Sequence, residues 1–124
     1  LANRAYLAQL AGDLPRPRRN LAERMRIGRE IGDRSGLIAD LERWAQLEAT
    51  AGSEREAVRV YAAAARSRET LDIPLEEHER PAHDEMLERL RQSLSVPVFD
   101  GAWQAGSVVP LDDLVAALTR TPDS

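Results

Sequence analysis

Apolar residues in this chain recur at the three- and four-residue spacing of an α-helix, and glycines interrupt the pattern. Strand-type alternation is hard to find anywhere in the sequence. Gly12, Gly32 and Gly52 each follow a helical stretch, at a position where glycine commonly ends a helix. The sequence therefore predicts an all-α fold of about seven helices. We expect them over about 1–11, 13–31, 35–51, 53–71, 78–94, 98–105 and 111–119.

The expected packing faces follow from the same periodicity. The second predicted helix is expected to turn Leu21, Met25, Gly28 and Ile31 toward the core. The fourth opens with Ser53–Glu54–Arg55–Glu56, which has the S-x-x-E pattern of a capping box. In that arrangement the Ser53 hydroxyl accepts from the amide of Glu56, and the Glu56 carboxylate reaches back to the amide of Ser53.

The first two predicted hairpins repeat each other at a distance of about 40 residues. Shifting the chain by this period places Leu1 on Leu41, and Ala11–Gly12 on Ala51–Gly52. One helical hairpin cannot bury its apolar face alone, so such units stack on one another. We expect two stacked hairpins over 1–75 and C-terminal capping helices over 76–124, in one continuous domain. The chain starts at Leu1 rather than at Met, so we expect it to be a piece of a longer protein.

Composition excludes several kinds of chemistry. The sequence has no cysteine, which rules out disulfides, thiolate catalysis and thiolate metal ligands. All 17 basic residues are arginine, so no phosphate-binding loop of the G-x-x-x-x-G-K-[ST] type can exist here. The net charge of −4 argues against general binding of nucleic acid by this segment. No apolar run reaches the roughly 20 residues of a membrane span, and no signal-peptide pattern is present, so we expect no membrane association and a cytoplasmic location.

The hairpin pattern resembles a tetratricopeptide repeat. With Gly52 at the turn, the packing positions of that repeat are occupied by Leu41, Trp44, Ala45, Ala57, Tyr61 and Ala64. The second half is similar to the C-terminal repeat region of LuxR-type and SARP-type transcriptional regulators and of predicted signal-transduction ATPases. The matching positions are Gly52, Ala57, Arg59, Ala63, Ala64, Pro74–Leu75, Glu79–Arg80, Ala102–Trp103, Gly106 and Leu111–Leu118.

The resemblance implies a short right-handed solenoid that binds protein or peptide, or that relays a signal within a bacterial regulator. Ser53, Tyr61–Ala62 and Pro110 depart from the family pattern. The family's nucleotide-binding and DNA-binding modules are absent from this chain, so neither activity carries over to it. We therefore expect no catalysis, no cofactor and no direct nucleic-acid contact.

Both histidines lie in the stretch His78–Glu79–Arg80–Pro81–Ala82–His83. The metalloprotease motif H-E-x-x-H needs histidines four apart on one helix face. Here they are five apart, which rotates the second by roughly a further 100°. We therefore expect surface histidines at an acidic helix start rather than a metal site.

The other charged and aromatic clusters are also predicted to have structural roles rather than to bind ligands. Arg16–Pro17–Arg18–Arg19 is either an anion-docking spot or a solvated helix face, and we expect the latter. The acids Asp84, Glu85 and Glu88 are expected to pair with Arg89 and Arg91 along a helix surface. Trp44 and Trp103 fall within apolar faces, which favours packing over ligand binding.

The concave face of the expected solenoid is the best candidate for a binding site. Its outward positions are predicted to be Tyr6, Gln9, Glu42, Gln46 and Ala49. The alternative is that two units form too short a groove and pack against neighbouring repeats of a longer chain. A competing hypothesis is a small-ligand sensor or small enzyme with a pocket between the repeats and the last three helices. Exposed solenoid ends also predict some self-association.

Overall fold

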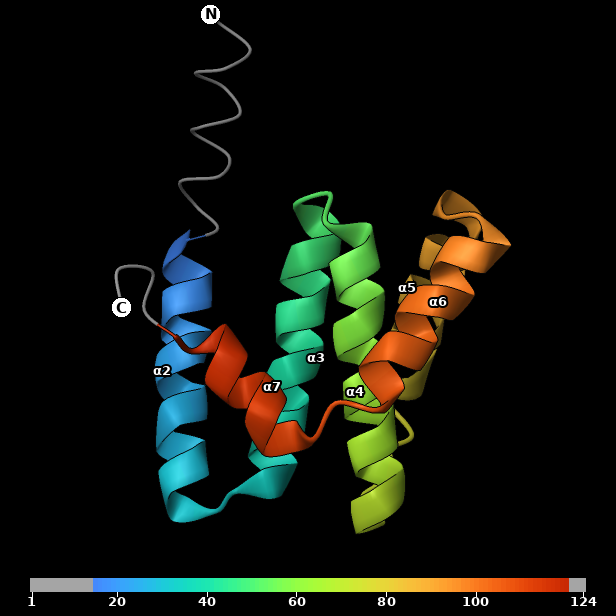
Figure 1. Cartoon of the computed structure of the whole chain (residues 1–124). Coiled ribbons are helices and arrows are strands. Elements are labelled where there is room, and N and C mark those ends of the chain that lie inside the picture. Colours follow the sequence, from blue (N-terminus) through green and yellow to red (C-terminus); the bar gives the residue numbers. More distant parts are fainter. Residues whose placement is uncertain (1–14, 121–124) are drawn as a thin grey trace, which may run out of the picture.

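The computed structural model describes residues 15–120, and within this range every regular element is an α-helix (Figure 1). The helices are α2 (Pro15–Ile31), α3 (Arg34–Thr50), α4 (Glu54–Leu71), α5 (Arg80–Ser93), α6 (Val96–Ser107) and α7 (Leu111–Leu118). The predicted all-α class is thereby confirmed for the described part of the chain. The helix predicted over 1–11 lies outside it.

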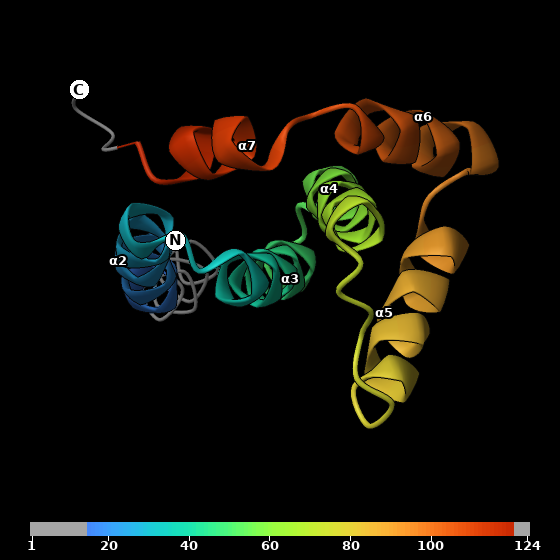
Figure 2. The same cartoon turned by 90° about the horizontal axis from the view of Figure 1, so that it is seen from below.

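The helices form two layers with one projecting arm. Helices α2, α3 and α4 run antiparallel, side by side, in the first layer (Figure 1). Helices α6 and α7 cross one face of that layer, so that α6 lies on α4 and α7 bridges from α4 back to α2. Helix α5 projects toward the opposite side (Figure 2). One face of the three-helix layer is thus covered by α6 and α7, and the other is bounded by α5.

The turns after α2 and α3 are built alike. Gly32 and Gly52 adopt φ of 74° and 90°, in the left-handed region where a side chain would be strained. The residue after each glycine donates its amide five residues back, from Asp33 to Gly28 and from Ser53 to Glu48, both at 2.8 Å. This bonding closes the helix end in a Schellman motif. The predicted helix ends at both glycines are therefore confirmed.

The third helix end uses the same motif without a glycine. Asp72 takes φ of 55°, and the amide of Ile73 donates to the carbonyl oxygen of Arg68 at 2.9 Å. Aspartate tolerates this conformation better than most residues do. The motif redirects the chain from α4 into the connection that leads to α5.

The predicted capping box at Ser53 is wrong, although α4 does begin there. The Ser53 side chain makes no capping hydrogen bond. The reciprocal bond from the Glu56 carboxylate is also absent, because the amide of Ser53 already donates to the carbonyl oxygen of Glu48 in the preceding turn. The Glu56 carboxylate instead accepts from Arg59 at 2.8 Å. Side-chain caps occur at α3, where Asp33 accepts from the amide of Gly36, and at α6, where Ser95 accepts from the amide of Val98.

The core lies where α3 and α4 meet their neighbours. Met25, Ile38 and Leu41 are fully buried there, and Val115 of α7 closes the core from above. The prediction for α2 holds for its first three inward positions but is wrong for Ile31, which is 72% exposed. Ile31 is the last helical residue before the Gly32 turn, where the chain leaves the packed face.

Two contacts fix the second layer. A methyl group at Gly106 of α6 would lie 2.0 Å from the backbone carbonyl oxygen of Arg59, so α6 lies directly on the backbone of α4. At the other end, Nη2 of Arg26 in α2 donates to the carbonyl oxygen of Thr119 at 2.7 Å. The second layer is therefore held to both edges of the first.

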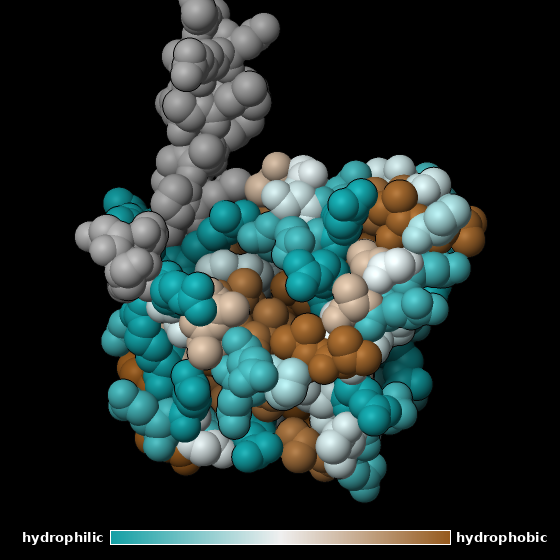
Figure 3. Space-filling view, in the orientation of Figure 1, coloured by the Kyte–Doolittle hydropathy of each residue, from teal (hydrophilic) through white to brown (hydrophobic). Residues whose placement is uncertain are grey.

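The outer surface of the second layer carries apolar residues at its centre. Figure 3 shows hydrophobic side chains gathered between α6 and α7. Val108, in the connection between these helices, is 79% exposed. None of the helices within residues 15–120 combines the length and the apolar character needed to cross a membrane.

Candidate partner-binding face

Two neighbouring grooves lie along α3, with lining residues from α2, α3, α4, α5 and the α4–α5 connection. Figure 2 shows α5 on the side of the three-helix layer away from α6 and α7. Three of the predicted binding residues, Glu42, Gln46 and Ala49, belong to α3. Gln46 is exposed and borders both grooves, Glu42 is half-buried, and Ala49 packs against the core. Tyr6 and Gln9 lie outside the described residues.

The first groove lies between α2 and α3, and we call it the α2–α3 groove. Its volume is about 490 Å³, within the range of roughly 300–1,000 Å³ typical of ligand sites. It is lined by Pro17, Asn20, Leu21, Arg24, Arg43, Gln46 and Leu47. Its lining thus combines apolar side chains, two amides and two guanidinium groups.

The second groove continues from the first toward α5, and we call it the α3–α5 groove. It has a volume of about 240 Å³ and shares Arg43 and Gln46 with the first. The other lining residues are Ala39, Glu42, Tyr61, Leu75, Glu79, Ala82 and His83. Since these residues come from α3, α4, α5 and the α4–α5 connection, the groove exists only in the folded hairpin with α5 in place.

Glu42 does not point freely outward as predicted, because α4 supplies it with a partner. Arg68 donates to both Glu42 carboxylate oxygens, from Nε at 2.8 Å and from Nη2 at 2.7 Å. The hydrogen bond to Glu42 raises the pKa of Arg68 against the opposing effect of burial. Nη1 of Arg68 donates to the carbonyl oxygen of Ile73 at 3.0 Å. One guanidinium group therefore ties α3, α4 and the α4–α5 connection together.

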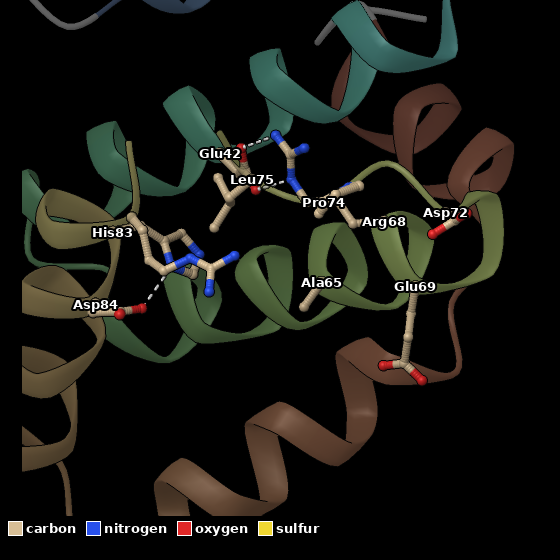
Figure 4. A pocket seen from close by; sticks show the side chains of 10 residues that line it. Glu42, Ala65, Arg68, Glu69, Asp72, Pro74, Leu75, His83 and Asp84 are labelled. Carbon is tan, nitrogen blue, oxygen red and sulfur yellow. Dashed lines mark hydrogen bonds and ion pairs between the residues drawn. The ribbon is translucent and has the colours of Figure 1, made fainter. Parts of the chain in front are cut away.

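This ion pair borders a third hollow, the Arg68 cavity, of about 430 Å³ (Figure 4). Its lining is mostly charged or titratable and consists of Glu42, Ala65, Arg68, Glu69, Asp72, Pro74, Leu75, Arg80, His83 and Asp84. It lies between the predicted repeats and the last helices, where the competing sensor or enzyme hypothesis expects a pocket. That hypothesis requires a closed apolar pocket with few polar groups, and this lining differs from it.

Tyr61 and His83 meet at the floor of the α3–α5 groove. Their rings contact edge to face, with centroids 5.4 Å apart and planes at 87°. Burial, with a smaller contribution from the Glu42 charge, raises the pKa of Tyr61 to about 12. Tyr61 therefore stays neutral over the physiological pH range and acts here as a packing residue.

The prediction of surface histidines is confirmed for His78, whose side chain is 75% exposed, and is wrong for His83, whose side chain is only 14% exposed. His83 packs on Tyr61, and its Nδ1 lies 3.4 Å from a carboxylate oxygen of Asp84. His78 lies with Glu76 and Glu79 in an exposed group whose candidate ligand atoms are within 4.8 Å of one another. His83 is not a member of that group, so the pairing of an H-E-x-x-H site is not formed.

The arginine-rich start of α2 divides into bound and solvated residues. Arg18 places Nη2 3.0 Å from Glu48 of α3 and stacks its guanidinium 5.8 Å from the ring centroid of Trp44. Arg16 and Arg19 are exposed, as the solvated-face interpretation predicts. Trp44 is 8% exposed and belongs to the core.

The remaining clusters also follow their structural interpretation. Trp103 is half-buried and stacks on Phe99, with centroids 6.1 Å apart. On α5, Glu85 pairs with Arg89 at 3.6 Å, and Glu88 pairs with Arg91 at 3.9 Å. These exposed pairs contribute little to stability. The expectation is wrong for Asp84, which lies beside His83 and not beside either arginine.

A buried carboxyl, which no sequence motif marks, lies beside Arg24 of the α2–α3 groove. Asp40 of α3 is only 5% exposed, and Nη2 of Arg24 lies 3.2 Å from its Oδ1. The approach does not have hydrogen-bond geometry, so Oδ1 has no hydrogen-bond partner within the described residues. Burial raises the pKa of Asp40, against the opposing charges of Arg24 and Arg43. A lone acidic residue in an otherwise apolar helix face was the only available signal for it.

Arg43 was also missed, although its position was readable. It lies three residues before Gln46 on the same side of α3, so the spacing that selected Gln46 also selects Arg43.

Comparison of this chain with protein-family models, with curated proteins and with solved structures finds no match.

Proposed function

We propose that this chain is a tetratricopeptide-like protein-interaction module without catalysis of its own, and that α3 forms the floor of its binding face. The observation that supports this best is the pair of grooves that meet at Arg43 and Gln46. Grooves of this kind, between helices of a rigid layer, accept peptides or partner helices. The parent protein we propose is a cytoplasmic bacterial transcriptional regulator of the LuxR or SARP type, in which the module binds a partner or relays a signal.

The repeat character of the proposal rests on the α3–α4 hairpin and its turns. Schellman motifs at Gly32 and Gly52 recur 20 residues apart, and Gly12 occupies the equivalent position in the sequence. We propose that α2 is the second helix of one unit and that α3–α4 is the next unit. Helices α5 to α7 then act as the cap that the resemblance predicts.

The test is selection of peptides from an unbiased displayed library against the purified chain. We expect enriched peptides that bind the chain with micromolar affinity or better. They should bind the Gln46→Trp variant more weakly, because the larger side chain occupies space in both grooves at the residue that they share. Val108→Trp is the matched control, because it introduces the same side chain at an exposed position in the connection between α6 and α7, outside both grooves. Absence of enrichment, or equal loss in both variants, contradicts the proposed binding face.

The competing sensor or enzyme function would use the Arg68 cavity. Its ionic groups include the Glu42–Arg68 pair, which already satisfies both partners. A thermal-shift screen with small metabolites addresses this function, and stabilisation that disappears in Arg80→Ala would support it over the interaction module. Self-association stays a separate prediction, which sedimentation at high concentration checks.

A further inference from the structure

We propose that the α2–α3 groove recognises an acidic peptide segment that carries an apolar side chain, with its carboxylates over Arg24 and Arg43. This inference rests on the proposed function, since it names the chemistry of the partner that the binding face would take.

The charge of the groove carries the argument. Arg24 and Arg43 are the only charged residues among those that line it, although the whole chain has a net charge of −4. Screening in physiological salt limits exposed charges to about 8 Å, so a bound segment responds mainly to the nearest charges. These are the two arginines and the buried carboxyl of Asp40, which lies 3.2 Å from Arg24 and offsets part of its charge, whereas Arg43 has no such ion pair within residues 15–120. The local preference is therefore for a negative ligand.

Both arginines keep donors available. Arg43 is exposed and forms no ion pair or side-chain hydrogen bond within residues 15–120. The Arg24 side chain is 58% exposed and meets Asp40 through Nη2 without a hydrogen bond. Guanidinium groups bind carboxylates through two parallel hydrogen bonds, which gives geometric selectivity as well as affinity.

The rest of the lining suits a peptide better than a free anion. Pro17, Leu21 and Leu47 supply an apolar surface beside the arginines, where one aliphatic or aromatic side chain would be desolvated. The amides of Asn20 and Gln46 each offer a donor and an acceptor to a peptide backbone. A phosphate backbone would make no use of the apolar part.

The neighbouring α3–α5 groove sets the direction of the segment. Its charged lining includes Glu79, which is exposed at the far side. Acidic residues would be repelled there, so the acidic part of the segment lies toward α2 and its neutral or basic part lies toward α5.

The experiment is a second readout of the displayed-library selection. We expect enriched sequences to combine two or more acidic residues with a large apolar residue. Synthetic peptides of the enriched sequence, measured by fluorescence anisotropy, should bind Arg43→Glu and Arg24→Glu about tenfold or more weakly. Arg43→Gln tests the same point with a smaller change. Arg19→Glu is the matched control, since it makes the same charge change at an exposed position outside the groove lining.

The outcomes separate the two proposals. Enrichment of neutral or basic peptides, or binding that is equally weakened by Arg19→Glu, overturns the acidic-partner inference and leaves the binding face standing. Absence of any enrichment overturns the proposed function and the inference with it. Tighter binding of a single-stranded DNA oligonucleotide than of the acidic peptide, with the same dependence on Arg43, also overturns the inference. Circular dichroism melts of each variant establish that a loss of binding is not a loss of folding.

Discussion

Gly106 of α6 rests against the carbonyl group of Arg59 in α4, and a methyl group at Gly106 would lie only 2.0 Å from that oxygen. The obstructing atoms belong to the backbone, so no side-chain rotation can relieve the contact. Contact between α4 and α6, which together hold α7 over the first layer, depends on this one position lacking a side chain.

Gly106→Ala should destabilise the chain by about 1–3 kcal/mol, because α6 has to move away from α4. Alanine is the better helix former by about 1 kcal/mol, so the loss is a net effect of the clash. Gly101→Ala in the same helix is the control, since nothing lies within 4 Å of the added methyl group. It should stabilise the chain by about 0.5–1 kcal/mol. Urea denaturation of both variants measures the difference, and equal effects would refute the close approach.

Removing the guanidinium of Arg68 should be more costly than removing an exposed charge. Its side chain is 11% exposed and that of Glu42 is 14% exposed, so Arg68→Ala leaves a poorly solvated carboxylate unpaired. We expect a loss of about 2–3 kcal/mol in the free energy of unfolding, and a smaller loss in Arg68→Lys, which keeps the charge without the fork. Arg89→Ala, whose ion pair is exposed, should change stability by less than about 0.5 kcal/mol. A double-mutant cycle with Glu42→Ala that shows no coupling would contradict this role.

Asp40 should make stability fall as pH rises. Burial raises its pKa above the ordinary 3.8, so in the range just above that value the folded chain holds the proton while the unfolded chain has lost it. Stability that is present at lower pH is therefore lost as the pH rises through the folded pKa. Asp40→Asn has no such proton, and its stability relative to the natural chain should rise across the same range. Denaturation at a series of pH values measures the free energy of unfolding of both proteins. If the two free energies change in parallel with pH, burial does not raise the pKa of Asp40 and the prediction is wrong.

The two histidines should differ although they are five residues apart. His83→Ala removes the edge-to-face contact with Tyr61 and should cost about 0.5–1.5 kcal/mol. The side chain of His78 is 75% exposed, so His78→Ala should stay within about 0.5 kcal/mol of the natural chain. Thermal melts of the two variants check this prediction. A larger loss in His78→Ala would give the exposed Glu76–His78–Glu79 group a structural role that the fold does not explain.

Local features of the fold were predictable from the sequence, and relations between distant residues were not. The glycine-ended helices follow from a period and a turn residue that any window of the chain displays. The Glu42–Arg68 pair joins residues 26 apart, and no local pattern marks it. Glu42 was accordingly selected as a free groove residue when α4 in fact supplies its partner.

The errors at Ser53 and Ile31 have a common cause. Each residue lies beside a Schellman turn, which uses backbone groups or redirects the chain before the side-chain pattern can act. The S-x-x-E pattern assumes a free amide at Ser53, and that amide is bonded to Glu48. For the candidate binding face, the α3 spacing selected Gln46, which borders both grooves. The arginines of the α2–α3 groove are brought together only by the placement of α2 beside α3.

The bond from Arg26 to Thr119 joins residues 93 apart in the chain. The entropic cost of closing a loop increases only slowly with its length. Closing this loop therefore costs about 1.4 kcal/mol more than closing a loop of about 20 residues. The long separation affects the rate of folding more strongly, because contacts between residues far apart in the sequence form after contacts between near ones. Helices α3, α4 and α6 can assemble through nearer neighbours, whereas α2 gains its α7 contacts last. Helix α2 can therefore dock on its neighbour α3 early, but its contact with α7 forms only after the segment between them has folded.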